Sequence, residues 1–193
     1  MPKTIIFALN IDLSSIYLVA PIYVYGPFPP GFEKVIPEGD VNSMSTNLHV
    51  YNLLAKGTGH RLPMFPGYVD VRDVACAHVL ALNSRPTSEV GHKRLALVSP
   101  HDSSWVDAIA HLANERPELK DRLLDTTDIP KPLFGNSVVG TPVDGLNKAL
   151  RFKPSDYTTW EDTILATVDS MIALEAEWKA KGFSVAVPTG PAE

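Results

Sequence analysis

The sequence has few of the features that mark a secreted, disulfide-bonded or membrane protein. Only one of its 193 residues is a cysteine, Cys76, so no disulfide can form within the chain. A reducing compartment, the cytoplasm, is therefore expected. We expect Cys76 to be buried, because its neighbours are small or apolar. The early apolar run is interrupted by Asn10 and Asp12 and has no clear cleavage site, so neither a signal peptide nor a membrane span is expected.

Positive charge and metal-binding patterns are also scarce. The 17 Lys and Arg residues are scattered and outweighed by 22 Asp and Glu residues, giving a net charge of −5. Nucleic-acid binding needs clustered basic residues, so no nucleic-acid partner is expected. The histidines form no His-x-x-x-His pair, and no Gly-x-Ser-x-Gly elbow of a serine hydrolase occurs. Gly57-Thr-Gly59 is no dinucleotide fingerprint, because Leu62 stands where a third glycine is needed.

What the sequence does contain is an alternation of apolar strands and amphipathic helices, which indicates the α/β class. An apolar fraction of 45% is ordinary for a globular protein with a core. We expect one structural unit over residues 1–183, followed by a loose tail over 184–193. The expected strands cover residues 15–25, 68–70 and 91–99. The expected helices cover residues 43–56, 71–82, 105–114, 117–128, 142–150 and 159–180.

The stretch Pro66–Leu82 is the central joint, where a short strand runs directly into a helix. The spacing predicts an inward stripe of Val71, Val74, Ala75, His78 and Leu82. Asp70 is expected to cap the helix, and Asp73 places negative charge in its first turn. These two carboxylates and Arg72 also suggest acid–base chemistry. We favour the structural interpretation, because their position at a helix start explains them fully.

The segment from Pro21 to Phe28 is the first candidate for a binding surface. It follows a nearly continuous apolar strand, which we expect to be buried on both faces inside a parallel sheet. Gly26 to Gly31 then forces a loop. Ligands of open α/β sheets bind beyond the carboxyl ends of the strands. A binding surface and a purely structural turn both remain possible from these residues alone.

Two motifs, Pro21-Ile-Tyr-Val-Tyr-Gly-Pro27 and Gly67-Tyr-Val-Asp-Val-Arg-Asp-Val-Ala-Cys-Ala-His78, resemble the extended short-chain dehydrogenase/reductases. This is the NAD-dependent epimerase/dehydratase superfamily. The branch that looks most similar is the dihydroflavonol-reductase-like NADPH-dependent aldehyde and ketone reductases. The resemblance implies a partial Rossmann-type fold, with the late sheet strands and the C-terminal substrate-binding lobe. It also implies NADP or NAD as cofactor and a small carbonyl compound as substrate.

The resemblance further implies roles for individual residues. Those that would contact the nicotinamide are Pro21, Ile22, Tyr23 and Val24. Those that would face the substrate are Tyr23, Tyr25 and Phe28. The sequence contains neither the Gly-rich cofactor turn nor the family's Tyr-x-x-x-Lys pair, so no catalytic residue is assigned. We expect the chain to lack activity alone and leave open whether it is an enzyme. The alternative is a non-catalytic binding or scaffold module derived from the substrate lobe.

Overall fold

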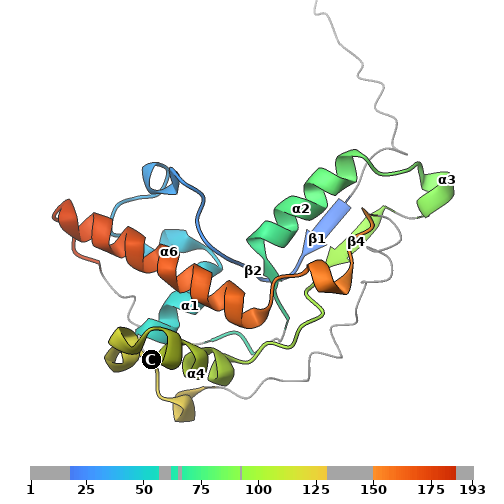
Figure 1. Cartoon of the computed structure of the whole chain (residues 1–193). Coiled ribbons are helices and arrows are strands. Elements are labelled where there is room, and N and C mark those ends of the chain that lie inside the picture. Colours follow the sequence, from blue (N-terminus) through green and yellow to red (C-terminus); the bar gives the residue numbers. More distant parts are fainter. Residues whose placement is uncertain (1–17, 57–61, 65–66, 92, 130–149, 186–193) are drawn as a thin grey trace, which may run out of the picture.

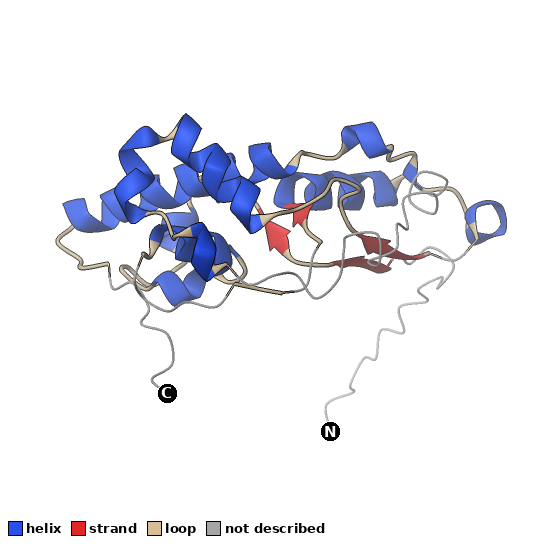
Figure 2. Cartoon of the chain, turned by 90° about the horizontal axis from the view of Figure 1, so that it is seen from below, coloured by secondary structure: helices blue, strands red, loops and turns tan. Residues whose placement is uncertain are grey.

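The computed structural model describes residues 18–56, 62–64, 67–91, 93–129 and 150–185. Its helices and parallel strands confirm the α/β class. The helices α1, α4 and α6 gather at one end of the molecule, and the strands β1 and β4 lie with α2 at the other (Figure 1, Figure 2). The candidate site lies where these two parts meet.

Four short strands form two parallel pairs. β1 (Leu18–Pro21) pairs with β4 (Arg94–Leu97), and β2 (Val24–Tyr25) pairs with β3 (Val69–Asp70). The backbone N–H of Ser99 donates to the carbonyl of Tyr68 at 2.7 Å, which connects the end of β4 to the start of β3. The single strand expected over 15–25 is therefore two strands separated by a bend.

The expectation that this strand would be buried on both faces is wrong. The side chain of Leu18 is 47% exposed, and most of β1 is exposed or half-buried. Among the described residues β1 is paired along one edge, with β4, and α2 lies against it (Figure 1). A strand with one partner and one covering helix keeps part of its surface in solvent.

The central joint is confirmed. α2 (Val71–Leu82) begins directly after β3. The Asp70 carboxylate caps it by accepting a hydrogen bond from the backbone N–H of Arg72 at 2.8 Å. Asp73 lies in the first turn, where the helix dipole favours a negative charge.

The predicted inward face of α2 is wrong in part, because Ala75, His78 and Leu82 are exposed, whereas Val74 packs against buried apolar side chains. The buried residues are Asp73 and Ala77, whereas Leu82 is 83% exposed. His78 and Cys76 are exposed as well, so the expected burial of Cys76 is also wrong. The helix turns the Asp73 side inward because that carboxylate accepts hydrogen bonds from the distant residue Thr158. Apolar spacing within the helix does not report this contact.

The segment expected to be one helix over 43–56 is broken. It forms the 3-10 turn η3 (Val41–Met44), the helix α1 (Asn47–Tyr51) and the 3-10 turn η4 (Asn52–Leu54). The break falls at Ser45, whose φ of 56° lies in the left-handed region and cannot continue a right-handed helix.

The helices expected over 105–114 and 159–180 are confirmed. α4 (Trp105–Glu115) begins after Ser104, whose hydroxyl accepts from the N–H of Asp107. α6 (Trp160–Ala180) begins after Thr159, whose hydroxyl accepts from the N–H of Asp162. The smaller elements are η2 (Phe32–Lys34), α3 (Thr87–Val90), η5 (Pro117–Arg122), η6 (Thr126–Asp128) and η8 (Pro154–Asp156). Most of the helix expected over 142–150, and the tail from residue 186, lie outside the described residues.

Two groups of buried apolar side chains hold these elements together. The larger packs α6 against α1 and α4, with Leu53, Leu112 and Trp178 fully buried in it. The smaller lies beneath β4 and α2 and includes Leu97 and Phe152. The first group forms the helical part of the molecule and the second forms the part that carries the strands.

A buried carboxylate adds a polar connection to the larger group. Glu175 of α6 is 5% exposed and accepts hydrogen bonds from Arg122 at 2.9 Å and from the Tyr51 hydroxyl at 3.2 Å. Lys179 forms an ion pair with its other oxygen. Burial alone would raise the pKa of Glu175, but the hydrogen bonds from Lys179 and Arg122 outweigh burial and lower it. The charged carboxylate thus joins α6 to η5 and α1.

Replacing this carboxylate by an amide, Glu175→Gln, is expected to reduce the free energy of unfolding at neutral pH by about 1–3 kcal/mol. The lowered pKa means that the stabilisation is present above the unfolded value of 4.5 and is lost as the pH falls through the folded pKa. Urea unfolding as a function of pH measures both effects. The difference between the variant and the wild type should shrink below pH 4.5.

The matched control is Glu177→Gln on the same helix. Glu177 pairs with Lys181 at the surface, where an ion pair contributes little, so we expect a change within about 0.5 kcal/mol. A Glu175→Gln difference that stayed constant from neutral pH into the acid range would contradict the assigned linkage.

Candidate functional site

The candidate site is a cavity of about 470 Å³ at the end of β2. This volume lies within the range of about 300–1,000 Å³ that is typical of small-molecule sites. Its wall comes from the end of β2, the loop after it, residues 43–47 and the first residue of α2. The lining residues are Val24, Tyr25, Gly26, Pro27, Phe28, Pro29, Phe32, Val35, Ile36, Ser43, Met44, Ser45, Thr46, Asn47 and Val71.

Gly26 lets the loop pass directly over the start of α2. Its φ is +145°, and a Cβ atom here would lie 2.5 Å from Cγ1 of Val71. Real Cβ atoms do not approach other atoms so closely, and the backbone conformation itself favours glycine. The close approach of β2 to α2 therefore depends on this residue.

Asn47 holds both backbone groups of Gly26. The Gly26 N–H donates to Oδ1 of Asn47 at 3.3 Å, and Nδ2 of Asn47 donates to the Gly26 carbonyl at 2.8 Å. The neighbouring Thr46 hydroxyl donates to the carbonyl of Val24. Both side chains come from the start of α1, so the start of this helix fixes the end of β2 and the loop that follows it.

The next part of the loop is fixed by α6. The backbone N–H of Phe28 donates to Oγ of Ser170 at 3.3 Å. The Phe28 ring stacks on Phe32, with ring centres 4.3 Å apart and planes 5° from parallel. These two rings also line a second cavity of about 240 Å³ against α6. The loop after β2 therefore lines two cavities.

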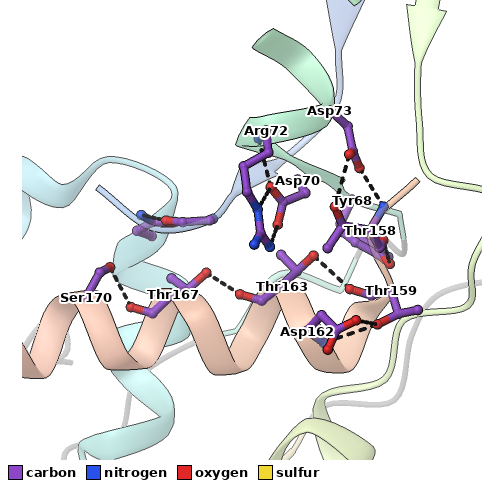
Figure 3. A network of polar contacts seen from close by, with 12 residues as sticks. Tyr68, Asp70, Arg72, Asp73, Thr158, Thr159, Asp162, Thr163, Thr167 and Ser170 are labelled. Carbon is purple, nitrogen blue, oxygen red and sulfur yellow. Dashed lines mark hydrogen bonds and ion pairs between the residues drawn. The ribbon is translucent and has the colours of Figure 1, made fainter. Parts of the chain in front are cut away.

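A series of hydrogen bonds connects the central joint to this loop (Figure 3). Asp73 accepts from the N–H and the hydroxyl of Thr158, at 2.9 and 3.0 Å. Along α6, the hydroxyls of Thr163 and Thr167 each donate to the carbonyl four residues earlier, and Ser170 donates to Thr167. Side chains of one helix face thus lead from the start of α2 to the residue that holds Phe28.

The Asp70, Arg72 and Asp73 group has a structural role in this geometry. Arg72 forms two hydrogen bonds to the fully buried Asp70 carboxylate, at 2.8 and 2.7 Å (Figure 3). Burial raises the pKa of Asp73, against the hydrogen bonds from Thr158. None of the three residues lines either cavity. Their carboxylates are engaged in capping and packing.

An aromatic cluster surrounds Tyr25, which is 2% exposed. The Tyr25 ring stacks with Tyr23 at 6.2 Å and meets the edges of Trp105 and Trp160, each at 5.9 Å. Burial raises the pKa of Tyr25 far above the ordinary phenol value, so its hydroxyl stays protonated. Tyr23 also meets the edge of the His49 ring, and burial lowers the pKa of His49. Both shifts favour the uncharged form of the side chain.

The residues of the expected site run from the end of β1, through β2, to the loop after it. Pro21 ends β1, and Ile22 and Tyr23 form the bend that follows. Of the six, those that line the 470 Å³ cavity are Val24, Tyr25 and Phe28, whereas Pro21, Ile22 and Tyr23 line neither cavity. Their cofactor and substrate roles remain predictions.

Sequence reasoning missed Asn47 and Ser170, which hold the loop. An asparagine on the buried face of an otherwise apolar helix was the available signal for Asn47. Within the described residues, no group of three or more His, Cys, Asp or Glu side chains is placed to hold a metal ion. The helices described here include none with the length and apolarity needed to cross a membrane.

The chain is similar in sequence and in fold to known reductases. No protein-family model matches the chain. The NADPH-dependent methylglyoxal reductase Gre2 of Saccharomyces cerevisiae is 29% identical over 163 residues, which cover 81% of this chain and 43% of Gre2. The crystal structure of yeast Gre2 complexed with NADPH superposes with a TM-score of 0.53 at 27% identity, over 82% of this chain and 46% of that one. The homologues of this chain are Gre2-type NADPH-dependent reductases.

Two further relatives agree with the Gre2 match. An uncharacterized oxidoreductase of Schizosaccharomyces pombe is 32% identical over 111 residues, covering 58% of this chain and 30% of that protein. Gre2 from Candida albicans has the same fold, with a TM-score of 0.55 at 20% identity over 81% of this chain and 44% of its own. The expected partial Rossmann-type reductase fold is thereby confirmed. The chain spans less than half the length of the curated relatives it matches.

Asn47→Leu should destabilise the fold by about 1–3 kcal/mol, because it leaves both backbone groups of Gly26 without their partners. Urea unfolding measures the loss, and faster hydrogen exchange at the Gly26 amide locates it. Asn42→Leu is the matched control, since its side chain is exposed, and should stay within about 0.5 kcal/mol. Equal losses in the two variants would show that the contacts with Gly26 contribute nothing.

Gly26→Ala is expected to destabilise the protein more than Gly31→Ala. Both positions have a positive φ that disfavours alanine, but a Cβ atom at Gly31 meets nothing within 4 Å. The additional loss at Gly26 therefore reports the close contact with Val71, and thermal melts of the two variants measure it. Equal melting temperatures would contradict this packing.

Proposed function

We propose that this chain forms the substrate-binding side of an NADPH-dependent carbonyl reductase. The observation that carries the proposal is the 470 Å³ cavity at the end of β2, whose backbone is held by Asn47 and Thr46. A similar fold occurs in a reductase complexed with NADPH. The substrate class is a small aldehyde or ketone, of which methylglyoxal is the one named for Gre2.

In this proposal the segment from Pro21 to Val24 lies along the nicotinamide ring. This segment carries no charged side chain, and a surface of uncharged, largely apolar side chains suits an aromatic ring. Tyr23, Tyr25 and Phe28 supply the substrate side, and the last two already line the cavity. The residues therefore fit the nicotinamide end of the cofactor. The 193 residues contain no Gly-rich turn to hold the pyrophosphate.

The chemistry of carbonyl reduction explains why this chain is expected to need a proton donor in addition to the residues of the candidate site. The bound cofactor supplies a hydride to the carbonyl carbon, and the resulting alkoxide must receive a proton. A general acid needs a pKa near the working pH. Tyr25 is a poor acid here, because burial raises its pKa and aromatic rings surround it. In this proposal Tyr25 does not donate that proton, and no described residue is assigned the role.

The exposed apolar surface of β1 and α2 also supports the proposal. Leu18 of β1 and Val79 and Leu82 of α2 are 47%, 61% and 83% exposed. In Figure 1 the strand and the helix that carry them lie side by side. Large exposed apolar side chains near one another mark interaction surfaces. This surface suits the packing of the cofactor-binding part of a reductase beside β1.

The decisive experiment measures NADPH oxidation in the presence of methylglyoxal. The 193-residue chain alone is expected to give no rate above the buffer. A fusion in which the chain replaces the matched part of Saccharomyces cerevisiae Gre2 is expected to turn over. Gly26→Ala should abolish most of that rate in the fusion, whereas the exposed Phe183→Ala should leave it unchanged.

Two outcomes would contradict the proposal. Turnover by the chain alone would show that a complete site is present. A fusion that melts cooperatively and binds NADPH, yet stays inactive, would favour the scaffold module instead. The two apolar groups and the Glu175 ion pairs give that alternative its support, because they connect the described elements into one packed fold.

A further inference from the structure

The two cavities share one wall, formed by the stacked rings of Phe28 and Phe32. The 470 Å³ cavity extends from this Phe28–Phe32 wall toward residues 43–47, and the 240 Å³ cavity extends from the same rings toward α6. The ring centres are 4.3 Å apart, and the planes differ by 5°. Such a stack presents continuous aromatic surface to both sides.

The backbone keeps this wall in place. The Phe28 N–H is held by the hydroxyl of Ser170, and prolines precede and follow the residue. Gly31, with a φ of 91°, turns the chain so that Phe32 returns onto Phe28. A ring fixed by its own backbone and by a stacked neighbour has little freedom to move aside for a ligand.

The second cavity is built for a neutral, apolar group. Ala173 and Leu174 contribute apolar surface, and the Ser170 hydroxyl is already engaged with Phe28 and Thr167. Glu33 and Glu177 also line the cavity, although Glu177 pairs with Lys181 at 2.8 Å. Two carboxylates disfavour an acidic group, so an alkyl tail suits this cavity and a carboxylate does not.

We propose that Phe28 sets the upper length of the neutral carbonyl compound that the larger cavity accepts. The ring stops the alkyl tail at the wall, and the 240 Å³ cavity behind it stays out of reach. Removing the ring joins the two cavities and lets a longer tail extend toward α6. This inference rests on the proposed function, because it assumes that a carbonyl compound binds in the larger cavity.

The test titrates the full 193-residue chain with methyl ketones from butanone to octanone and follows the backbone amides by NMR. In the wild type, affinity should rise with chain length and then level off, with shifts confined to the larger cavity. In Phe28→Ala the rise should continue, by about fourfold for each added methylene that is buried. Shifts at the amides of Ser170 and Leu174 should appear with the longer ketones in this variant alone.

Two further variants guard against indirect effects. Phe183→Ala removes an equal ring from the surface, lines neither cavity and should keep the wild-type plateau. Phe28→Leu keeps an apolar side chain and should move the plateau by a smaller step, so it serves if the alanine variant fails to fold. A thermal melt of each variant shows whether it is folded.

The outcomes separate this inference from the proposed function. Ketones that bind the larger cavity of the wild type with no length limit, or an unchanged plateau in Phe28→Ala and Phe28→Leu, would overturn the role of Phe28 alone. No binding by any ketone in any folded variant would overturn the carbonyl site itself, and the length limit with it.

Discussion

The two hydrogen bonds that Thr158 donates to Asp73 join parts of the chain that are 85 residues apart. They place the start of α6 against the start of α2. They fix one end of a helix that is continuous from Trp160 to Ala180, while the larger apolar group packs the length of that helix against α1 and α4. Ser170, further along the same helix, reaches the backbone of Phe28. The joint at α2 and the loop beside the cavity are therefore both held by α6.

The helix α6 is held by a buried carboxylate near each end, and the two respond to pH in opposite ways. Burial raises the pKa of Asp73, so the folded state binds its proton more readily than the unfolded chain, and its contribution improves as the pH falls. The pKa of Glu175 is lowered despite burial, so its contribution weakens as the pH falls. As the pH falls, protonation of Glu175 weakens the contacts of α6 with η5 and α1. Protonation of Asp73 lowers the free-energy cost of burying that side chain at the joint. The two ends of one helix are not equivalent in acid.

The features that the sequence predicts well are local ones. The cap at Asp70 follows from a side chain that bonds to backbone two residues away, and the helices after Ser104 and Thr159 begin within a residue of their expected starts. The part of the inward face of α2 that the sequence did not predict includes Asp73, which turns inward and accepts hydrogen bonds from the distant Thr158. The break at Ser45 falls beside residues that bond to Val24 and Gly26 across the molecule. A long-range hydrogen bond leaves no periodic trace in the sequence.

The candidate site shows the same division. Its position beyond a strand follows from the α/β pattern and the glycine and proline residues after Tyr25. The side chains that shape it come from α1 and α6, about 20 and 140 residues away along the chain. The position of the site is therefore readable from sequence, whereas the side chains that hold its wall become visible once the fold is known.

The loop after β2 also bears on the speed of binding. Pro27, Pro29 and Pro30 fix three φ angles, and the remaining backbone is tied at Gly26 and Phe28. Most of the conformational entropy of this loop is lost when the protein folds, so a ligand has little left to immobilise. The wall is complete before the ligand arrives, and no closing motion of this loop need follow the encounter. Desolvation of the apolar surface and the width of the entrance should then set the association rate, and no separate loop-closure step should follow binding.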